Sequence, residues 1–188
     1  TNISITTAYQ RDEGILKRVR GTPLPPWIFF GGKILSSILI ALIGTLIMIG
    51  AGILFFGLQL YVETIPVLIV TFFFGVATFA ALGLLVAALA PTGQAATAIA
   101  NATLLPLAFV SGVFIIPGED MPSWLTAVSD FFPLSHFVAP FVAAFTPEAT
   151  RPAFEWTDLA YLARWGVVAM ALAIRWFRWE PGGGGGRR

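Results

Sequence analysis

Residues 34–56 read ILSSILIALIGTLIMIGAGILFF, an apolar run without a single charged side chain. A hydrocarbon core about 30 Å thick requires roughly 20 apolar helical residues to cross it, and this run is long enough. Its glycines would weaken a soluble helix, but glycine is frequent in membrane helices. The stretch therefore predicts a membrane-spanning helix.

Three further apolar segments extend this pattern along the chain. We expect spans at 65–89, 94–116 and 159–177, each near the length that a bilayer demands. The sequence APTG at 90–93 predicts a compact turn, so the second and third spans form a helical hairpin. The chain is therefore expected to be an all-α polytopic membrane protein with four crossings, folded as one domain over residues 1–188.

The composition supports the membrane assignment and excludes several classes of function. Hydrophobic residues make up 57% of the chain and charged residues 11%, whereas about a quarter of a soluble domain is charged. A net charge of +1 gives no basic surface for nucleic acid. The sequence has no cysteine, no phosphate-binding loop and no metalloprotease motif. We therefore expect no enzymatic site, no metal and no cofactor bound by this chain.

The segment between the third and fourth predicted spans has a different pattern. Its apolar part, Phe131 to Phe145, is about 22 Å long as a helix, which is too short to cross a bilayer. Prolines interrupt it, so we expect two short re-entrant or interfacial helices over 121–145. A lone histidine cannot form a zinc site, so we interpret it as an ordinary interfacial residue. The residues assigned to this re-entrant segment are Pro117, Pro122, Trp124, Pro133 and His136.

Basic residues gather on one predicted side of the membrane. Five precede the first span and four lie at or beyond the end of the last one, and an even number of crossings places these nine together. By the positive-inside rule, both termini are expected in the cytoplasm of a multi-pass plasma membrane protein. The glycine-rich tail at 181–188 is expected to be flexible and to carry no site.

The segment 9–26 predicts a short basic amphipathic helix ahead of the first span. Ile15, Leu16 and Val19 fall on one helical stripe, and prolines at 23, 25 and 26 separate this helix from the span. From spacing alone, the favoured interpretation is a helix held by anionic lipid, at about 1 kcal/mol per basic residue. The alternative is a helix that binds a partner protein on the cytoplasmic side.

Several polar residues form a stripe along the third predicted span, beginning at Gln94. An asparagine inside a membrane usually bonds to a neighbouring helix, an interaction worth about 0.6 kcal/mol. Polar groups are costly in a bilayer, so the stripe could instead line a substrate path. The candidates for that path are Thr97, Asn101 and Ser111.

Residues 11–24, RDEGILKRVRGTPL, resemble a signature of type-2 ABC exporter permeases, a family that includes drug-resistance and polysaccharide exporters. The shared order is an acidic residue, glycine, leucine, two basic residues, arginine and then Thr-Pro-Leu. A second region is similar as well. It comprises FVSGVF at 109–114, Pro117, MPSWL at 121–125 and FPLSH at 132–136.

The resemblance implies a permease with six spans and two short re-entrant helices before the last one. ATP and Mg²⁺ would be held by a separate nucleotide-binding ATPase subunit, and two permease copies, identical or different, would pair among the membrane lipids. Residues 1–8 would be the end of the second span, so the first two spans are expected to be missing from this chain. The segment after them would be the ATPase-coupling helix, with the residues Glu13, Gly14, Ile15, Leu16, Lys17, Arg18, Val19 and Arg20.

Two other classes of function stay open beside the export of a hydrophobic or amphipathic substrate. An ion-coupled secondary transporter would normally bury an ionisable residue near the midplane, and none lies at the middle of the four predicted spans. A membrane enzyme acting on lipid-linked substrates would use Glu119, Asp120 and His136 at the outer interface. No paired constellation there favours that enzyme.

Overall fold

The computed structural model describes residues 2–23, 25–58, 61–110, 123–143, 145, 156–177 and 179. Within these ranges the chain is helical and contains no strand, as the all-α prediction requires. The helices are α1 (Asn2–Asp12), α2 (Ile15–Arg20), α3 (Pro26–Phe56), the 3-10 helix η1 (Val62–Thr64), α4 (Ile65–Leu89), α5 (Gly93–Val110), α6 (Ser123–Phe131), α7 (Pro133–Ala143) and α8 (Trp156–Trp176).

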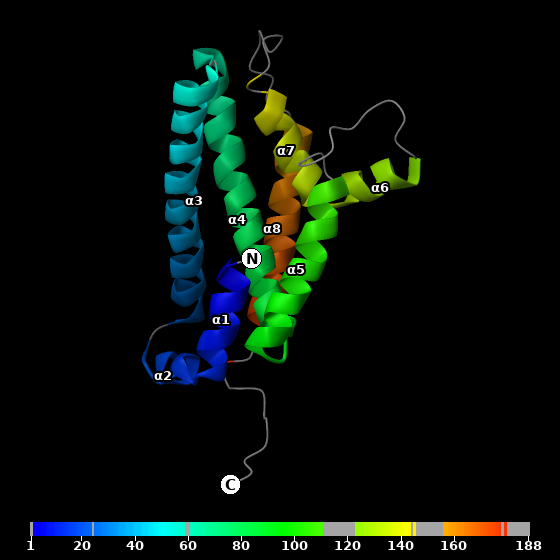
Figure 1. The fold of residues 1–188 in the computed structure, drawn as a ribbon. Helices are drawn as coiled ribbons and strands as arrows, with labels where there is room; N and C mark the ends of the chain where they lie inside the picture. The colour runs from blue at the N-terminus through cyan, green and yellow to red at the C-terminus, as the bar shows by residue number, and fades with distance from the viewer. Residues whose placement is uncertain are drawn as a thin grey trace.

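Helix α4 lies at the centre of the bundle, with α1, α3, α5, α7 and α8 around it (Figure 1). Many of its buried residues are small, among them Gly75, Thr78, Ala81 and Gly83. Lipid tails are as apolar as leucine, so burial of large apolar side chains drives little association between membrane helices. Close approach of the backbones over small residues supplies the packing instead, which explains why the central helix is rich in them.

The most extensive contact of α4 is with α8. The Thr78 hydroxyl donates a buried hydrogen bond to the Leu162 carbonyl oxygen at 2.8 Å. Gly166 lies opposite, and a Cβ atom at that position would stand 3.0 Å from the Thr78 Oγ1. Ala169 and Ala173 are buried and continue the small face along α8. The two helices therefore meet almost backbone to backbone.

Gly166→Ala is expected to lower the melting temperature of the protein in detergent. The added methyl group pushes against Thr78, and overpacking of this kind costs about 1–3 kcal/mol. Gly44→Ala in α3 is the matched control, because nothing lies within 4 Å of its Cβ position and alanine favours a helix. Equal melting temperatures for the two variants would contradict the close α4–α8 contact.

Helix α3 stands at the side of the bundle and exposes most of its apolar surface, as a lipid-facing helix does (Figure 1). It begins at Pro26, earlier than the predicted start at Ile34. Proline suits the first turn of a helix, where its missing N–H needs no partner and its φ is already helical. The prolines that were expected to precede the span therefore start it.

Among the described residues, three helices are long and apolar enough to cross a membrane, namely Trp27–Phe56, Val62–Leu89 and Trp156–Trp176. They correspond to the first, second and fourth predicted spans. The third predicted span, 94–116, coincides with α5 as far as the structure describes it, but α5 is not among the three. Its crossing of the membrane stays a prediction.

The helices alternate in direction, so that several connections gather at one end of the bundle (Figure 1). Helix α2, the α4–α5 turn and the last turn of α8 lie at this end, and the α3–α4 link lies at the other. Residues that follow α8 pack against the start of α3 through aromatic rings whose centroids are 5.1–6.3 Å apart. These rings belong to Phe29, Phe30, Phe177 and Trp179.

Candidate functional site

A tight corner separates α1 from α2. Gly14 adopts a left-handed conformation with φ of 75°, which glycine reaches without steric cost. The Glu13 N–H donates to the Tyr9 carbonyl oxygen and the Gly14 N–H to the Arg11 carbonyl oxygen, both at 2.9 Å. The predicted single segment 9–26 is therefore divided into the last turn of α1, the short helix α2 and the start of α3.

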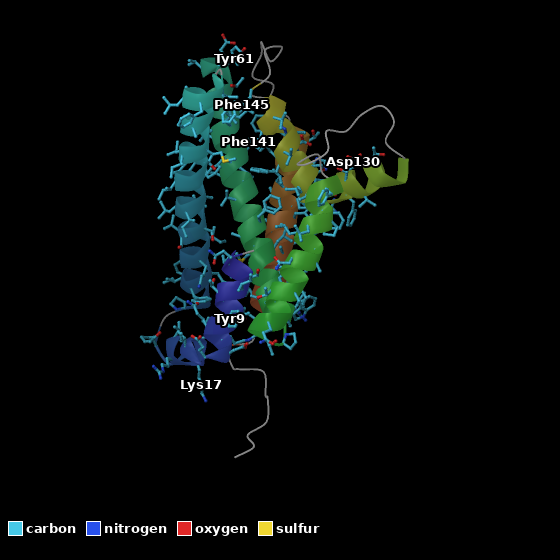
Figure 2. All side chains as sticks on the ribbon, in the orientation of Figure 1. Tyr9, Lys17, Tyr61, Asp130, Phe141 and Phe145 are labelled. Carbon is cyan, nitrogen blue, oxygen red and sulfur yellow. The ribbon has the colours of Figure 1, made fainter. Side chains whose placement is uncertain are left out.

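Helix α2 lies at the end of the bundle with one open face, from which Lys17 projects away (Figure 2). Glu13, Lys17 and Arg18 are exposed, and Ile15 is 41% exposed. Leu16 is only 1% exposed. The sequence placed Leu16 on the docking stripe, whereas the structure buries it, because a stripe in so short a helix does not fix which face is covered. Among the remaining coupling residues, Gly14 and Val19 are half-buried, and the side chain of Arg20 lies outside the described residues.

The two residues before this corner hold α1 against the α4–α5 turn. Arg11 is 2% exposed, and its Nη1 and Nη2 donate to the carbonyl oxygens of Ala87 at 2.9 Å and Ala90 at 2.7 Å. Asp12 Oδ2 accepts a hydrogen bond from the Gly93 N–H at 2.6 Å. The cation thus caps the free carbonyls that end α4, and the anion caps a free N–H that begins α5. Each charge lies at the helix end whose dipole favours it.

Sequence reasoning missed this pair, because Arg11 was interpreted as a basic residue near the membrane and as part of the family signature, without a partner of its own. The partners of Arg11 and Asp12 lie 76 to 81 positions along the chain, so no local pattern reveals them. The signal that could have found the pair is the sequence RDEG itself. It places two opposite charges side by side at the end of a helix, just before a glycine.

Helices α6 and α7 form the predicted pair of short helices. With 9 and 11 residues they are too short to cross a bilayer. The Ser135 hydroxyl donates to the Ser129 carbonyl oxygen at 2.8 Å and closes the corner between them. Helix α6 points outward from the bundle, whereas α7 runs beside α4 and α8 (Figure 1). Pro133 is buried at the corner, Trp124 belongs to α6 with its side chain outside the described residues, and Pro117 and Pro122 lie outside them entirely.

His136 ties this corner to the start of α8. Its Nδ1 lies 2.6 Å from Oδ1 of Asp158, and its Nε2 lies 2.9 Å from the Asp130 carbonyl oxygen. The ring also packs on the Tyr161 ring with centroids 4.2 Å apart, and the Tyr161 hydroxyl donates to the Phe131 carbonyl oxygen at 2.7 Å. The histidine that the sequence presented as an ordinary interfacial residue therefore joins three helices. Its carboxylate partner, 22 positions away, was not predicted.

Aromatic side chains pack α7 against α4. The Phe137 ring lies so close over Gly75 that a Cβ atom there would overlap it. The same ring packs against Phe79 of α4 with centroids 5.7 Å apart and against Phe141 of α7 with centroids 5.5 Å apart. The position of α7 therefore depends on Gly75 in the central helix α4.

A cavity of about 670 Å³ lies among α1, α3, α4 and α7. At its polar side the Lys33 Nζ donates to Gln10 Oε1 at 2.8 Å. Phenylalanines of α4 and α7 form the opposite side, so the lining suits a ligand that is partly polar and partly apolar. The lining residues include Thr6, Gln10, Lys33, Ser36, Ser37, Thr45, Phe72, Phe79, Phe137 and Phe141.

The polar stripe of α5 is only partly turned toward the bundle. The Thr97 hydroxyl donates to the Gly93 carbonyl oxygen of its own helix at 3.0 Å. Asn101 is exposed, so none of the described helices covers it. Ser111 lies outside the described residues. The structure therefore does not bring the three path candidates together, and it leaves Asn101 on an open face.

Single cysteines test the orientation of the bundle. Glu63→Cys in the α3–α4 link is expected to react from outside the cell with a membrane-impermeant maleimide. Thr92→Cys in the α4–α5 turn is expected to react only after the membrane is permeabilised, because the basic residues should keep that end in the cytoplasm. Both positions are exposed, and this chain has no cysteine of its own. Reaction of Thr92→Cys in intact cells would show that the protein has the opposite orientation to the predicted one.

The comparisons with known proteins match the chain to one transporter family. Residues 1–146 match the family model of the ABC-2 type transporter. The chain is 26% identical over 134 residues to the "Probable multidrug ABC transporter permease YbhR" of Escherichia coli (strain K12), which covers 71% of this chain and 36% of that protein. The protein of the same name from Escherichia coli O157:H7 matches equally well. The chain thus spans about a third of the length of these curated relatives, and no solved structure is significantly similar to it.

Proposed function

The chain belongs to the ABC-2 type transporter family, and from this membership we propose that it forms part of the permease of an ATP-driven exporter. A separate ATPase subunit binds ATP and Mg²⁺, and a second permease copy completes the transporter. The observation that most supports the proposed ATPase partner is the placement of α2 at the end of the bundle with an open face. This face lies on the cytoplasmic side.

Helix α2 has the chemistry of a docking helix. Its exposed residues combine one apolar side chain, Ile15, with the cations Lys17 and Arg18. An apolar contact supplies most of the affinity of an interface, and the surrounding charges guide and orient the partner. When ATP closes the ATPase subunits, their differential binding biases the permease between its inward-facing and outward-facing states.

The open face of α5 is the proposed contact with the second permease copy and with the substrate path. Asn101 is exposed on this face, and a polar side chain in a membrane requires a partner helix or a polar path. The substrate is proposed to be hydrophobic or amphipathic. The mixed lining of the cavity beside α7 supports this class, as does the word "multidrug" in the name of the E. coli relatives.

Ile15→Asp tests the docking role of α2 in the full-length permease. The ATPase subunit is expected to lose at least about tenfold in affinity, because an unpaired charge in an apolar contact costs more than about 1.4 kcal/mol. The measurement is co-purification of ATP hydrolysis activity with the tagged permease from membranes of its own host. Ile15→Leu, which keeps the side chain apolar, is the matched control and should retain the activity.

The lipid interpretation of α2 predicts a different result. If anionic lipid were its main partner, Lys17→Glu and Arg18→Glu would release the helix from the membrane, and Ile15→Asp would leave ATP hydrolysis activity in the purified sample unchanged. An unchanged activity for Ile15→Asp therefore rejects the docking role.

A further inference from the structure

Arg11 and Asp12 do more than hold α1 in place: we propose that they form the joint through which a movement of α2 reaches α4 and α5. The proposal rests on the proposed function, since it requires an ATPase subunit that acts on α2. It identifies two positioning residues that lie directly before the docking helix in the chain.

The connection from α2 to the joint is short and held by hydrogen bonds. Only Glu13 and Gly14 separate Asp12 from the first residue of α2. The N–H groups of both residues are bonded back to carbonyl oxygens of α1. A displacement of α2 is therefore passed to the end of α1 instead of being absorbed by a slack loop.

The end of α1 is in turn fixed to two helices at once. The guanidinium of Arg11 makes two hydrogen bonds to the end of α4 in its fixed planar geometry, and Asp12 makes one to the start of α5. Arg11 is almost fully buried, so its bonds cannot be exchanged for water without opening the corner. The α4–α5 turn therefore cannot shift relative to α1 unless all three bonds give way.

Packing beside the joint keeps α1 close to both helices. The Tyr9 ring lies against Gly93, where a Cβ atom would stand 2.8 Å from it, and Ile3 lies against Gly83 of α4. These contacts are apolar and allow sliding, whereas the hydrogen bonds of Arg11 and Asp12 fix the register. Through this joint, a movement of α1 is therefore expected to move the end of α4 and the start of α5 with it.

The test uses the full-length permease together with its ATPase subunit. A cysteine introduced at the exposed Ala102 of α5 reports movement through its rate of reaction with a maleimide, with and without ATP. In the wild-type protein, ATP is expected to change this rate about fivefold or more, the lower range of allosteric coupling. Asp12→Ala, which removes the acceptor for the Gly93 N–H, and Arg11→Gln should lose this ATP response while the ATPase subunit still co-purifies.

Two control variants separate coupling from stability. Asp12→Asn keeps an oxygen acceptor and should retain the ATP response. Arg164→Gln removes an exposed arginine of α8 and should behave as wild type. If Arg11→Gln does not accumulate in the membrane, the comparison of Asp12→Ala with Asp12→Asn decides alone whether the joint transmits the ATP response.

The possible failures are distinguishable. If Asp12→Ala keeps the ATP response, or loses the ATPase subunit altogether, the joint is overturned. If no ATPase subunit co-purifies with the wild-type permease, the proposed function fails instead.

Discussion

Leu16→Asp is expected to destabilise the protein strongly, whereas Ile15→Asp next to it should barely change its stability. Leu16 is 1% exposed and Ile15 is 41% exposed. A carboxylate in a buried apolar position without a partner costs on the order of 3 kcal/mol or more, while a surface substitution stays within about 0.5 kcal/mol. The measurement is the melting temperature of the purified full-length variants in one detergent.

This pair of variants also separates folding from docking. The stability of Ile15→Asp should match wild type although the proposed ATPase subunit should no longer bind. Leu16→Asn should be milder than Leu16→Asp because it adds no charge. Equal melting temperatures for Leu16→Asp and Ile15→Asp would show that Leu16 does not pack inside the chain, and the docking face would then have to include it.

Gly75→Val is the second change with a large expected effect, because it disrupts the packing of α7 against α4. The new side chain would occupy the space of the Phe137 ring, which neighbouring rings hold in place. Overpacking at such a site costs about 1–3 kcal/mol, and displacement of α7 should also loosen the contact between His136 and Asp158. The melting temperature should fall accordingly.

A double-mutant cycle identifies the cause. Phe137→Ala frees the space above Gly75, so adding it to Gly75→Val should recover part of the lost stability, with a coupling of about 0.5–3 kcal/mol. Gly44→Val, in the open part of α3, is the matched control for placing valine in a helix. Additive effects of Gly75→Val and Phe137→Ala would contradict direct contact between the two positions.

The long helices could be predicted from the sequence because the bilayer imposes length and apolarity on each span. The stretches 34–56, 65–89 and 159–177 carry that signal in consecutive residues, and their helices were found. The start of α3 was misplaced because proline was interpreted as the end of a helix, although it serves equally well in a first turn. The short helices α6 and α7 followed from apolar lengths that were too small for a span.

The contacts of the candidate site were harder to predict, since they join residues distant in sequence. Arg11 is basic and near the membrane by sequence, but its burial depends on the docking of α1 at the end of α4. The inward face of Leu16 depends on how the left-handed Gly14 aims α2. The pairing of His136 with Asp158 requires the fold of α6 and α7 onto α8. Hydrophobic periodicity carries none of this information.

Photo-crosslinking from position 15 tests the central claim most directly, since it asks what touches α2 in the native membrane. A benzophenone amino acid replaces Ile15 in the full-length protein, and a second variant carries it at Ile47, which is 67% exposed on α3. After illumination, mass spectrometry identifies the crosslinked species. We predict an ATPase with a phosphate-binding loop at position 15 and only lipid at position 47. Lipid adducts alone at both positions would contradict the account.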